Sequence, residues 1–265
     1  MSIEFHQVEF LIEGYLLPPT IERLRISENL ILEQVYSQEK PHVTVAYVGV
    51  SSVGEKNYFP DAVTYMDFFL LVYTLMSGQK VSHTMGAGTK LDNVKSLGRR
   101  RASFHVEEVQ VLGRPKDDPL ARCILKVRKR FLHLLPDRQK IMDSHLGLAL
   151  TFYYVAVHAR RLEEAVISLM TAAEALLCTE TTNVRKDLSR RLSALIEKDS
   201  TKKSEVAKKM LELYELRSGI IHGGGKKPSL SDTRVLFDYV KRAIERGLSL
   251  RRLSKKEFAA RLDAW

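Results

Sequence analysis

Alternation of apolar and polar residues marks the first fifty positions of the chain. Val8–Gly14, Leu30–Tyr36 and His42–Val50 alternate in polarity and are rich in β-branched residues. Segments of this kind are typical of strands, and Ile21–Ile26 is a further candidate. The pattern predicts an antiparallel β layer at the amino-terminal end.

The period changes after this layer. Apolar residues recur every three or four positions in Asp61–Ser77, which predicts a helix that packs across the sheet. Ser82–Lys95 is rich in glycine and small polar residues, and we expect a surface loop there. Its piece Met85–Lys90 contains glycine, threonine and lysine, but it lacks the spacing of a phosphate-binding loop. Ala102–Leu112 favours another strand.

A connecting segment leads into the second half of the chain. Leu120–Leu135 predicts a helix, although its piece Ile124–Val127 also suits a strand. Pro136 and Asp137 end this segment. We therefore expect a β-rich domain over residues 1–138 and a second domain over residues 139–265.

The second domain reads as helical throughout. Amphipathic or apolar segments with short connections follow one another, and such a pattern is typical of an up-and-down bundle. We expect Asp232 to cap the fifth helix. The six predicted helices are Ile141–His158, Arg161–Cys178, Asn183 or Val184 to Lys198, Lys203–Ile221, Thr233–Leu248 and Lys255–Asp263. The predicted fold class is α+β, an antiparallel sheet with one packed helix followed by an all-α bundle.

The fourth of these helices runs into three glycines. Glycine enters left-handed backbone geometry without a steric cost, so Gly223–Gly225 should end the helix. Arg217, Ser218 and His222 then fall in its last turn and a half. Ser218 and His222 are four residues apart, which places them on one face of the helix.

These three residue types suit phosphate chemistry. Arginine carries a fixed charge and a flat fork of donors that fits phosphate oxygens. Histidine can move a proton near neutral pH. Together Arg217 and His222 could bind a phosphodiester and perform acid–base work on it. A plainer interpretation is also open, because basic residues favour the negative end of any helix dipole and glycine is an ordinary stop signal.

Composition places the chain among globular proteins with a basic excess. It is 45% hydrophobic and 28% charged. The net charge of +10 is uneven: residues 1–139 hold 18 Lys and Arg against 16 Asp and Glu, whereas residues 140–265 hold 24 against 16. The basic excess thus accompanies the Arg–His pair and favours a polyanionic partner, although a solvated lysine-rich surface explains it equally well.

Other features bound the cellular setting. The two cysteines, Cys123 and Cys178, suggest no disulfide framework, and their spacing does not match that of zinc ligands. We see no signal peptide and no apolar stretch that would span a membrane. We therefore expect a cytoplasmic protein that uses no metal or other cofactor.

Three segments, taken in order, resemble one family. Leu213–Gly223 is similar to the signature helix of HEPN domains, in particular the Apea-like branch with its "Y..RS...HG" run, in which Tyr214 is the tyrosine. Ile167–Leu177 resembles the earlier "alE.Ll" helix of that family, and Leu188–Ile196 resembles its middle helix. The family motif is an arginine and a histidine separated by four to six residues, and four separate Arg217 from His222. The resemblance covers residues 140–247.

The resemblance implies a metal-independent endoribonuclease that acts in phage defence or a toxin-like stress response. Arg217 would stabilise the phosphorane, His222 would transfer protons, and Ser218 would position the imidazole or a phosphate oxygen. Glu174 lies amid small apolar residues, so it needs a partner if buried, and Arg217 or Arg191 is a natural one. The resemblance also implies RNA as the substrate and a homodimer that shares one cleft. The amino-terminal domain would sense a trigger, bind substrate or respond to a regulatory protein.

Two other functions stay open. The chain could be a non-catalytic HEPN module that binds nucleotide or RNA or assembles with a partner. It could also be a DNA-binding regulator that uses the basic region 241–261, although no helix-turn-helix pattern stands out.

Overall fold

The computed structural model describes residues 3–13, 17, 21–35, 43–53, 59–91, 109–111, 118–180, 182–223 and 227–264. The chain divides into two compact units, Met1–Pro136 and Asp137–Trp265. This division falls two residues before the boundary expected from the sequence. The first unit is an antiparallel sheet with helices and the second is helical, which confirms the α+β class.

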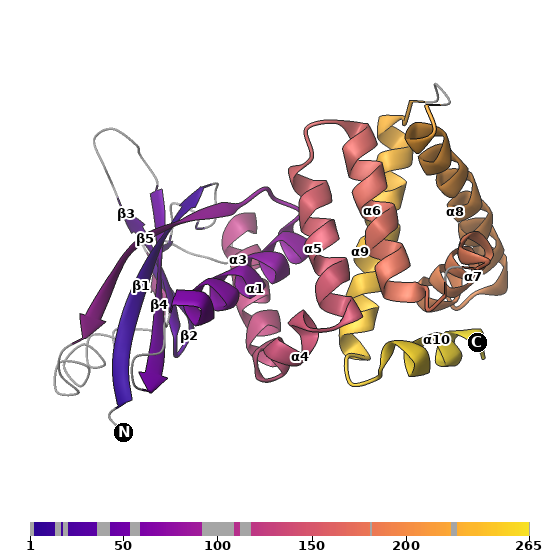
Figure 1. The fold of residues 1–265 in the computed structure, drawn as a ribbon. Coiled ribbons are helices and arrows are strands. Elements are labelled where there is room, and N and C mark those ends of the chain that lie inside the picture. The colour runs from indigo at the N-terminus through magenta and orange to yellow at the C-terminus, as the bar shows by residue number, and fades with distance from the viewer. Residues whose placement is uncertain are drawn as a thin grey trace. The chain divides into compact units, whose positions relative to one another are not determined.

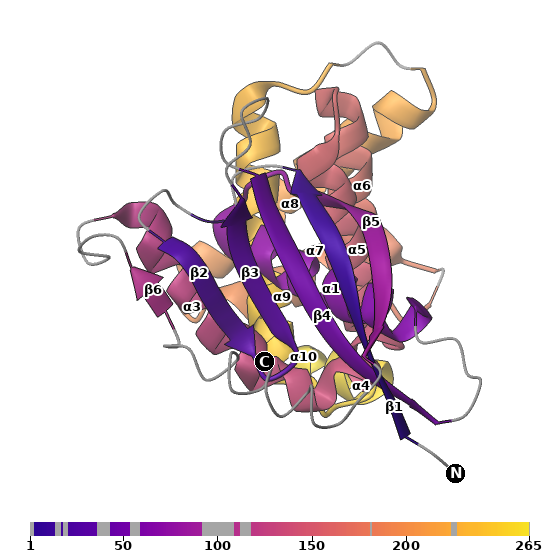
Figure 2. The same ribbon diagram turned by 90° about the vertical axis from the view of Figure 1, so that its left-hand side faces the viewer.

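The described strands of the first unit form one six-stranded sheet, in the order β5-β1-β4-β3-β2-β6. Every pair of neighbouring strands is antiparallel. Figure 2 shows the strands side by side in this order. The strands are β1 (Ile3–Glu13), β2 (Ile21–Ser27), β3 (Leu30–Val35), β4 (Val43–Val53), β5 (Ser82–Leu91) and β6 (Val109–Val111).

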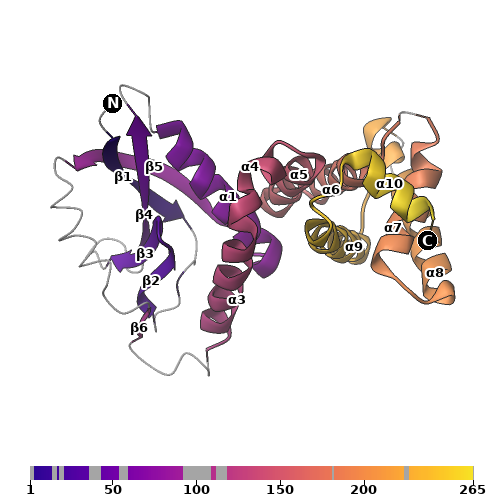
Figure 3. The ribbon, with the colours of Figure 1, turned by 90° about the horizontal axis from the view of Figure 1, so that it is seen from below.

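Alternation along the strands produces one buried face. In β1, Val8, Phe10 and Ile12 are buried while Leu11 is exposed. Helices α1 (Phe59–Ser77) and α3 (Pro119–Leu134) lie on one side of the strands (Figure 3). Phe131 of α3 joins the two helices, because its ring meets three aromatic rings of α1 at 5.3 to 5.7 Å between centroids. The predicted helix over Leu120–Leu135 is therefore confirmed, and no strand forms within it.

The surface loop expected over Ser82–Lys95 is wrong for Ser82–Leu91, which forms strand β5. Glycine disfavours strands, but among the described strands β5 is an edge strand that pairs only with β1, from Glu13↔Ser82 to Phe5↔Leu91. An edge position with a register shift tolerates such residues. Met85–Lys90 thus belongs to a strand. Of the strand expected over Ala102–Leu112, the structure places Val109–Val111 in β6, and the rest lies outside the described residues.

The second unit is a helical bundle, in which α5, α6 and α9 lie side by side (Figure 1). A 3-10 turn, Leu135–Asp137, leads into it. None of the helices among the described residues is long and apolar enough to cross a membrane. The helices of the bundle are α4 (Arg138–Met142), α5 (His145–His158), α6 (Leu162–Leu177), α7 (Val184–Ile196), α8 (Ser200–Ile221), α9 (Leu230–Ser249) and α10 (Lys255–Asp263).

In the bundle, three helix starts differ from the sequence prediction by more than one residue, and α8 begins at Ser200, three residues before the expected Lys203. The segment expected as one helix from Ile141 to His158 breaks after Met142, and the Ser144 hydroxyl caps α5 by accepting from the N–H of Leu146. A Cβ on Gly147 would lie 2.4 Å from the carbonyl oxygen of Met142, so the break depends on a residue without a side chain. Helix α9 begins at Leu230 under a Ser229 cap, and Asp232, the expected cap, lies in its first turn.

Candidate functional site

Helix α8 ends where the glycines predict. Gly223 has a φ of +71°, the left-handed geometry that ends helices, and Gly224 and Gly225 lie outside the described residues. His222 is the C-cap of α8, and its N–H donates to the carbonyl oxygen of Ser218 at 3.0 Å. Ser218 and His222 are therefore stacked one helical turn apart, as their spacing predicts.

The His222 side chain is exposed at this helix end. Within the described part of the chain, its imidazole makes no hydrogen bond or ion pair, and no bond joins it to the Ser218 hydroxyl. Of the two roles expected for Ser218, the contact with a phosphate oxygen fits this arrangement better than the positioning of the imidazole.

Arg217 is held from a second helix. Its Nη2 lies 3.8 Å from Oε2 of Glu174 on α6, and the two side chains are only 24% and 22% exposed. The pairing of Glu174 with Arg217 was one of the two partnerships expected from the sequence. The Nε of Arg217 is buried and finds no hydrogen-bond partner among the described residues. The guanidinium is thus anchored on one side and keeps a donor unused.

Tyr214 completes this cluster from one turn earlier on α8. The guanidinium carbon of Arg217 lies 5.8 Å from the centre of its ring, within the range of a cation–π contact. Burial raises the pKa of the Tyr214 phenol, and the nearby charge of Glu174 and a hydrogen bond to it add to the effect. Glu174, Tyr214 and Arg217 therefore form one group, called the Arg217 cluster below.

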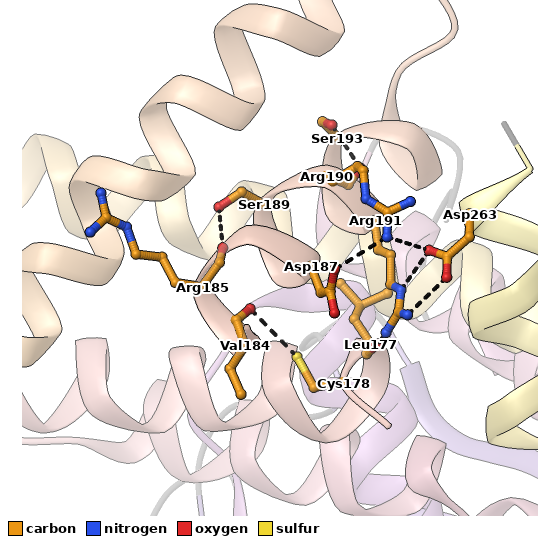
Figure 4. Close-up of polar contacts among 10 residues, drawn as sticks. All are labelled: Leu177, Cys178, Val184, Arg185, Asp187, Ser189, Arg190, Arg191, Ser193 and Asp263. Atoms are coloured by element: carbon orange, nitrogen blue, oxygen red, sulfur yellow. Dashed lines mark hydrogen bonds and ion pairs between the residues drawn. The ribbon is translucent and has the colours of Figure 1, made fainter. Parts of the chain in front are cut away.

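Arg191, the other expected partner of Glu174, is engaged elsewhere. Its Nε and Nη2 donate to the two carboxylate oxygens of Asp263 at 2.7 and 2.9 Å, and its Nη1 donates to the carbonyl oxygen of Leu177 at 2.9 Å. Figure 4 shows this fork, with Arg185 extending away from it. The hydrogen bonds from Arg191 lower the pKa of the Asp263 carboxyl. Of the two partners expected for Glu174, the structure pairs it with Arg217, and Arg191 instead joins α7 to α10 and to the end of α6.

Sequence reasoning missed Asp263 because nothing local points to it. It lies 72 residues from Arg191, in a short charged helix that reads as a solvated surface. Among the described residues, no group of three or more His, Cys, Asp and Glu side chains is arranged to hold a metal ion.

Comparisons with protein-family models, curated proteins and solved structures found no match.

Proposed function

We propose that the chain is a metal-independent endoribonuclease of the HEPN type. The observation that carries this proposal is that the Arg217 cluster and an exposed His222, five residues after Arg217, both lie near the carboxyl-terminal end of α8. A partly buried guanidinium that Glu174 and Tyr214 already hold can bind a phosphate through its Nη groups without first losing much side-chain freedom. The three-segment resemblance to HEPN domains and the basic excess of residues 140–265 support it.

The chemistry follows from these groups. The 2′-hydroxyl of the nucleotide before the scissile bond attacks the adjacent phosphorus, and the 5′ oxygen leaves. His222 takes the proton from the hydroxyl or gives one to the leaving oxygen. Arg217 stabilises the negative charge that accumulates on the phosphorane. The products are a 2′,3′-cyclic phosphate and a free 5′-hydroxyl.

Each chain supplies one such histidine, whereas the reaction uses both an acid and a base. A homodimer that brings two copies of His222 to one cleft would supply both. In this proposal the protein is cytoplasmic and acts in phage defence or a toxin-like stress response. The sheet unit would sense the trigger, bind substrate or receive a regulatory protein.

The reaction products test this function. Purified protein should cleave RNA in excess EDTA, and mass spectrometry should find 2′,3′-cyclic phosphate ends. A matched substrate with a single 2′-deoxy nucleotide at the scissile position should resist cleavage. A requirement for magnesium, or cleavage of the 2′-deoxy substrate, would show that another mechanism operates.

A second candidate is a non-catalytic RNA-binding module, favoured by the pairing of Arg217 with Glu174, which occupies part of the guanidinium. In that case the protein would bind RNA and leave it intact under all conditions in which binding is saturated. The same assay separates the two functions.

A further inference from the structure

An open trough runs along α7 and α8, outside the Arg217 cluster. It consists of two hollows of about 720 and 530 Å³, which share Asn183, Lys186 and Leu211 in their linings. The larger hollow extends to Lys203 and the smaller one ends at Tyr214. We call the whole the α7–α8 trough. Hollows of this volume are typical of ligand sites.

Small side chains explain why the trough exists. Ala194 of α7 and Ser204 and Ala207 of α8 line it, so the two helices do not fill the space between them. Leu211 and Leu262 supply apolar surface within it. The trough therefore combines an apolar lining with polar side chains, as binding sites commonly do.

The charged side chains of the trough favour an anion. Four cationic residues, Arg185, Lys186, Arg190 and Lys203, line it against two carboxylates. Both carboxylates are neutralised within the protein, because Arg190 pairs with Asp187 at 3.2 Å and with Asp263 at 2.8 Å. Lys186, by contrast, is exposed and forms no salt bridge within the described part of the chain. Arg185 pairs with Glu215, which lies outside the lining, so the net positive charge of the trough comes from its lysines.

The trough leads to the proposed active site. From Lys203 to Tyr214 it follows α8 for eleven residues, about 16 Å at 1.5 Å per residue. Tyr214, at its end, is the residue whose ring contacts Arg217. An elongated anion bound along the trough would therefore reach the Arg217 cluster. A single nucleotide would occupy only part of the trough and need not reach that cluster.

We propose that the α7–α8 trough binds the backbone of single-stranded RNA on one side of the scissile phosphate. Lys186 and Lys203 contact phosphates there, and the apolar lining receives a base. This inference rests on the proposed ribonuclease function and adds the path by which the strand approaches Arg217. It also explains why the cations are placed along α7 and α8, away from the histidine.

Binding of a strand that cannot be cut tests the trough apart from catalysis. The probe is a short, fluorescein-labelled 2′-O-methyl RNA of mixed sequence, and the measurement is fluorescence anisotropy with the full chain. Lys186→Ala/Lys203→Ala removes two trough cations. Lys198→Ala/Lys256→Ala removes two exposed lysines outside the trough lining and is the charge-matched control. Ser204→Trp fills the trough at an exposed position without changing charge.

The trough variants should bind on the order of tenfold more weakly than the wild type at low salt, and the control should bind nearly as the wild type does. For Lys186→Ala/Lys203→Ala, the slope of log affinity against log salt should become shallower by about 1.4, because each lost phosphate contact on a single strand contributes about 0.7. Thermal unfolding of each variant shows that the fold is kept.

The outcomes separate this inference from the proposed function. If the trough variant and the control variant lose RNA affinity equally, binding depends on the overall charge of the protein, and the proposed trough site is wrong. Unchanged binding by Ser204→Trp would do the same, as would displacement of the strand by a mononucleotide at equal concentration. If the wild type cuts no RNA while the trough variants still lose binding, the ribonuclease proposal fails and the trough remains an RNA site.

Discussion

Nη2 of Arg217 lies 3.8 Å from Oε2 of Glu174, and the two residues, 43 positions apart in the chain, lie on different helices. The distance is that of a loose ion pair, and it leaves the buried Nε of the guanidinium without a partner. Glu174 therefore fixes the direction of Arg217 without using all of its donors. In the proposed enzyme, Glu174 is a positioning residue.

Replacing Glu174 with glutamine keeps the shape of the side chain and removes its charge. We expect kcat for RNA cleavage to fall about tenfold with little change in KM, because Arg217 loses its anchor and meets the transition state less well. Stability should change by about 1 kcal/mol or less, since both side chains are partly exposed. Glu212→Gln, on the exposed side of α8, is the matched control. Wild-type kcat in Glu174→Gln would remove Glu174 from the mechanism.

The Arg191–Asp263 fork should make stability depend on acid pH. The pKa of Asp263 is lowered in the folded protein, so its contribution is present above the unfolded value of about 3.9 and is lost as pH falls through the folded value. Asp263→Asn should cost about 2 kcal/mol at neutral pH, less than for a fully buried pair because 35% of Asp263 is exposed. Urea unfolding at neutral pH and below pH 4 measures both.

Two comparisons make this prediction specific. Asp238→Asn removes a carboxylate that is 59% exposed and pairs with Arg242 at 3.5 Å, and it should cost about 0.5 kcal/mol or less. The difference between wild type and Asp263→Asn should shrink in acid. A difference that stays constant from neutral to acid pH would mean that the fork contributes through packing and not through charge.

Local sequence signals were sufficient where a feature depends on the backbone conformation of one residue or on the pattern of its neighbours in the chain. The end of α8 could be predicted because Gly223 alone accepts a φ of +71° at low cost. The strands could be predicted because alternation encodes one buried face, as in Val8, Phe10 and Ile12. The same logic placed Ser218 and His222 one turn apart.

Signals that depend on partners distant in sequence were not visible. β5 carries glycines that read as a loop, and only its pairing with β1 makes it a strand. The break before α5 was missed although it is local, because the close approach of Gly147 to the Met142 carbonyl five residues earlier leaves no mark on the apolar periodicity. Arg191 and Glu174 seemed suitable partners by charge, but the fork geometry of Asp263 decided the pairing. Charge alone does not show which of several oppositely charged side chains within reach will form the ion pair.

The homodimer prediction can be tested at Ile221, which precedes His222 and is 46% exposed. An apolar side chain beside the proposed cleft suits a contact between two copies. Light scattering should show a dimer for the wild type and a monomer for Ile221→Glu, with cleavage reduced at least about tenfold because each site then lacks a second acid–base group. Leu148→Glu, 50% exposed on α5, is the control and should remain a dimer. A monomeric wild type that still cuts RNA would contradict the shared cleft.

The assignment of the active site itself depends on His222 and Arg217. His222→Ala and Arg217→Ala should each reduce cleavage on the order of 100-fold or more, because acid–base catalysis and charge stabilisation of the phosphorane each contribute that much. His222 is exposed at a helix end and Arg217 makes only a loose pair, so unfolding free energies should fall by about 1 kcal/mol or less. His133→Ala and Arg234→Ala, both at exposed positions, are the matched controls and should cut RNA at the wild-type rate. Arg217→Lys should recover only part of the rate, because an ammonium lacks the two-donor fork. If His222→Ala cuts RNA as fast as the wild type does, the proton transfer occurs elsewhere and this helix end is not the active site.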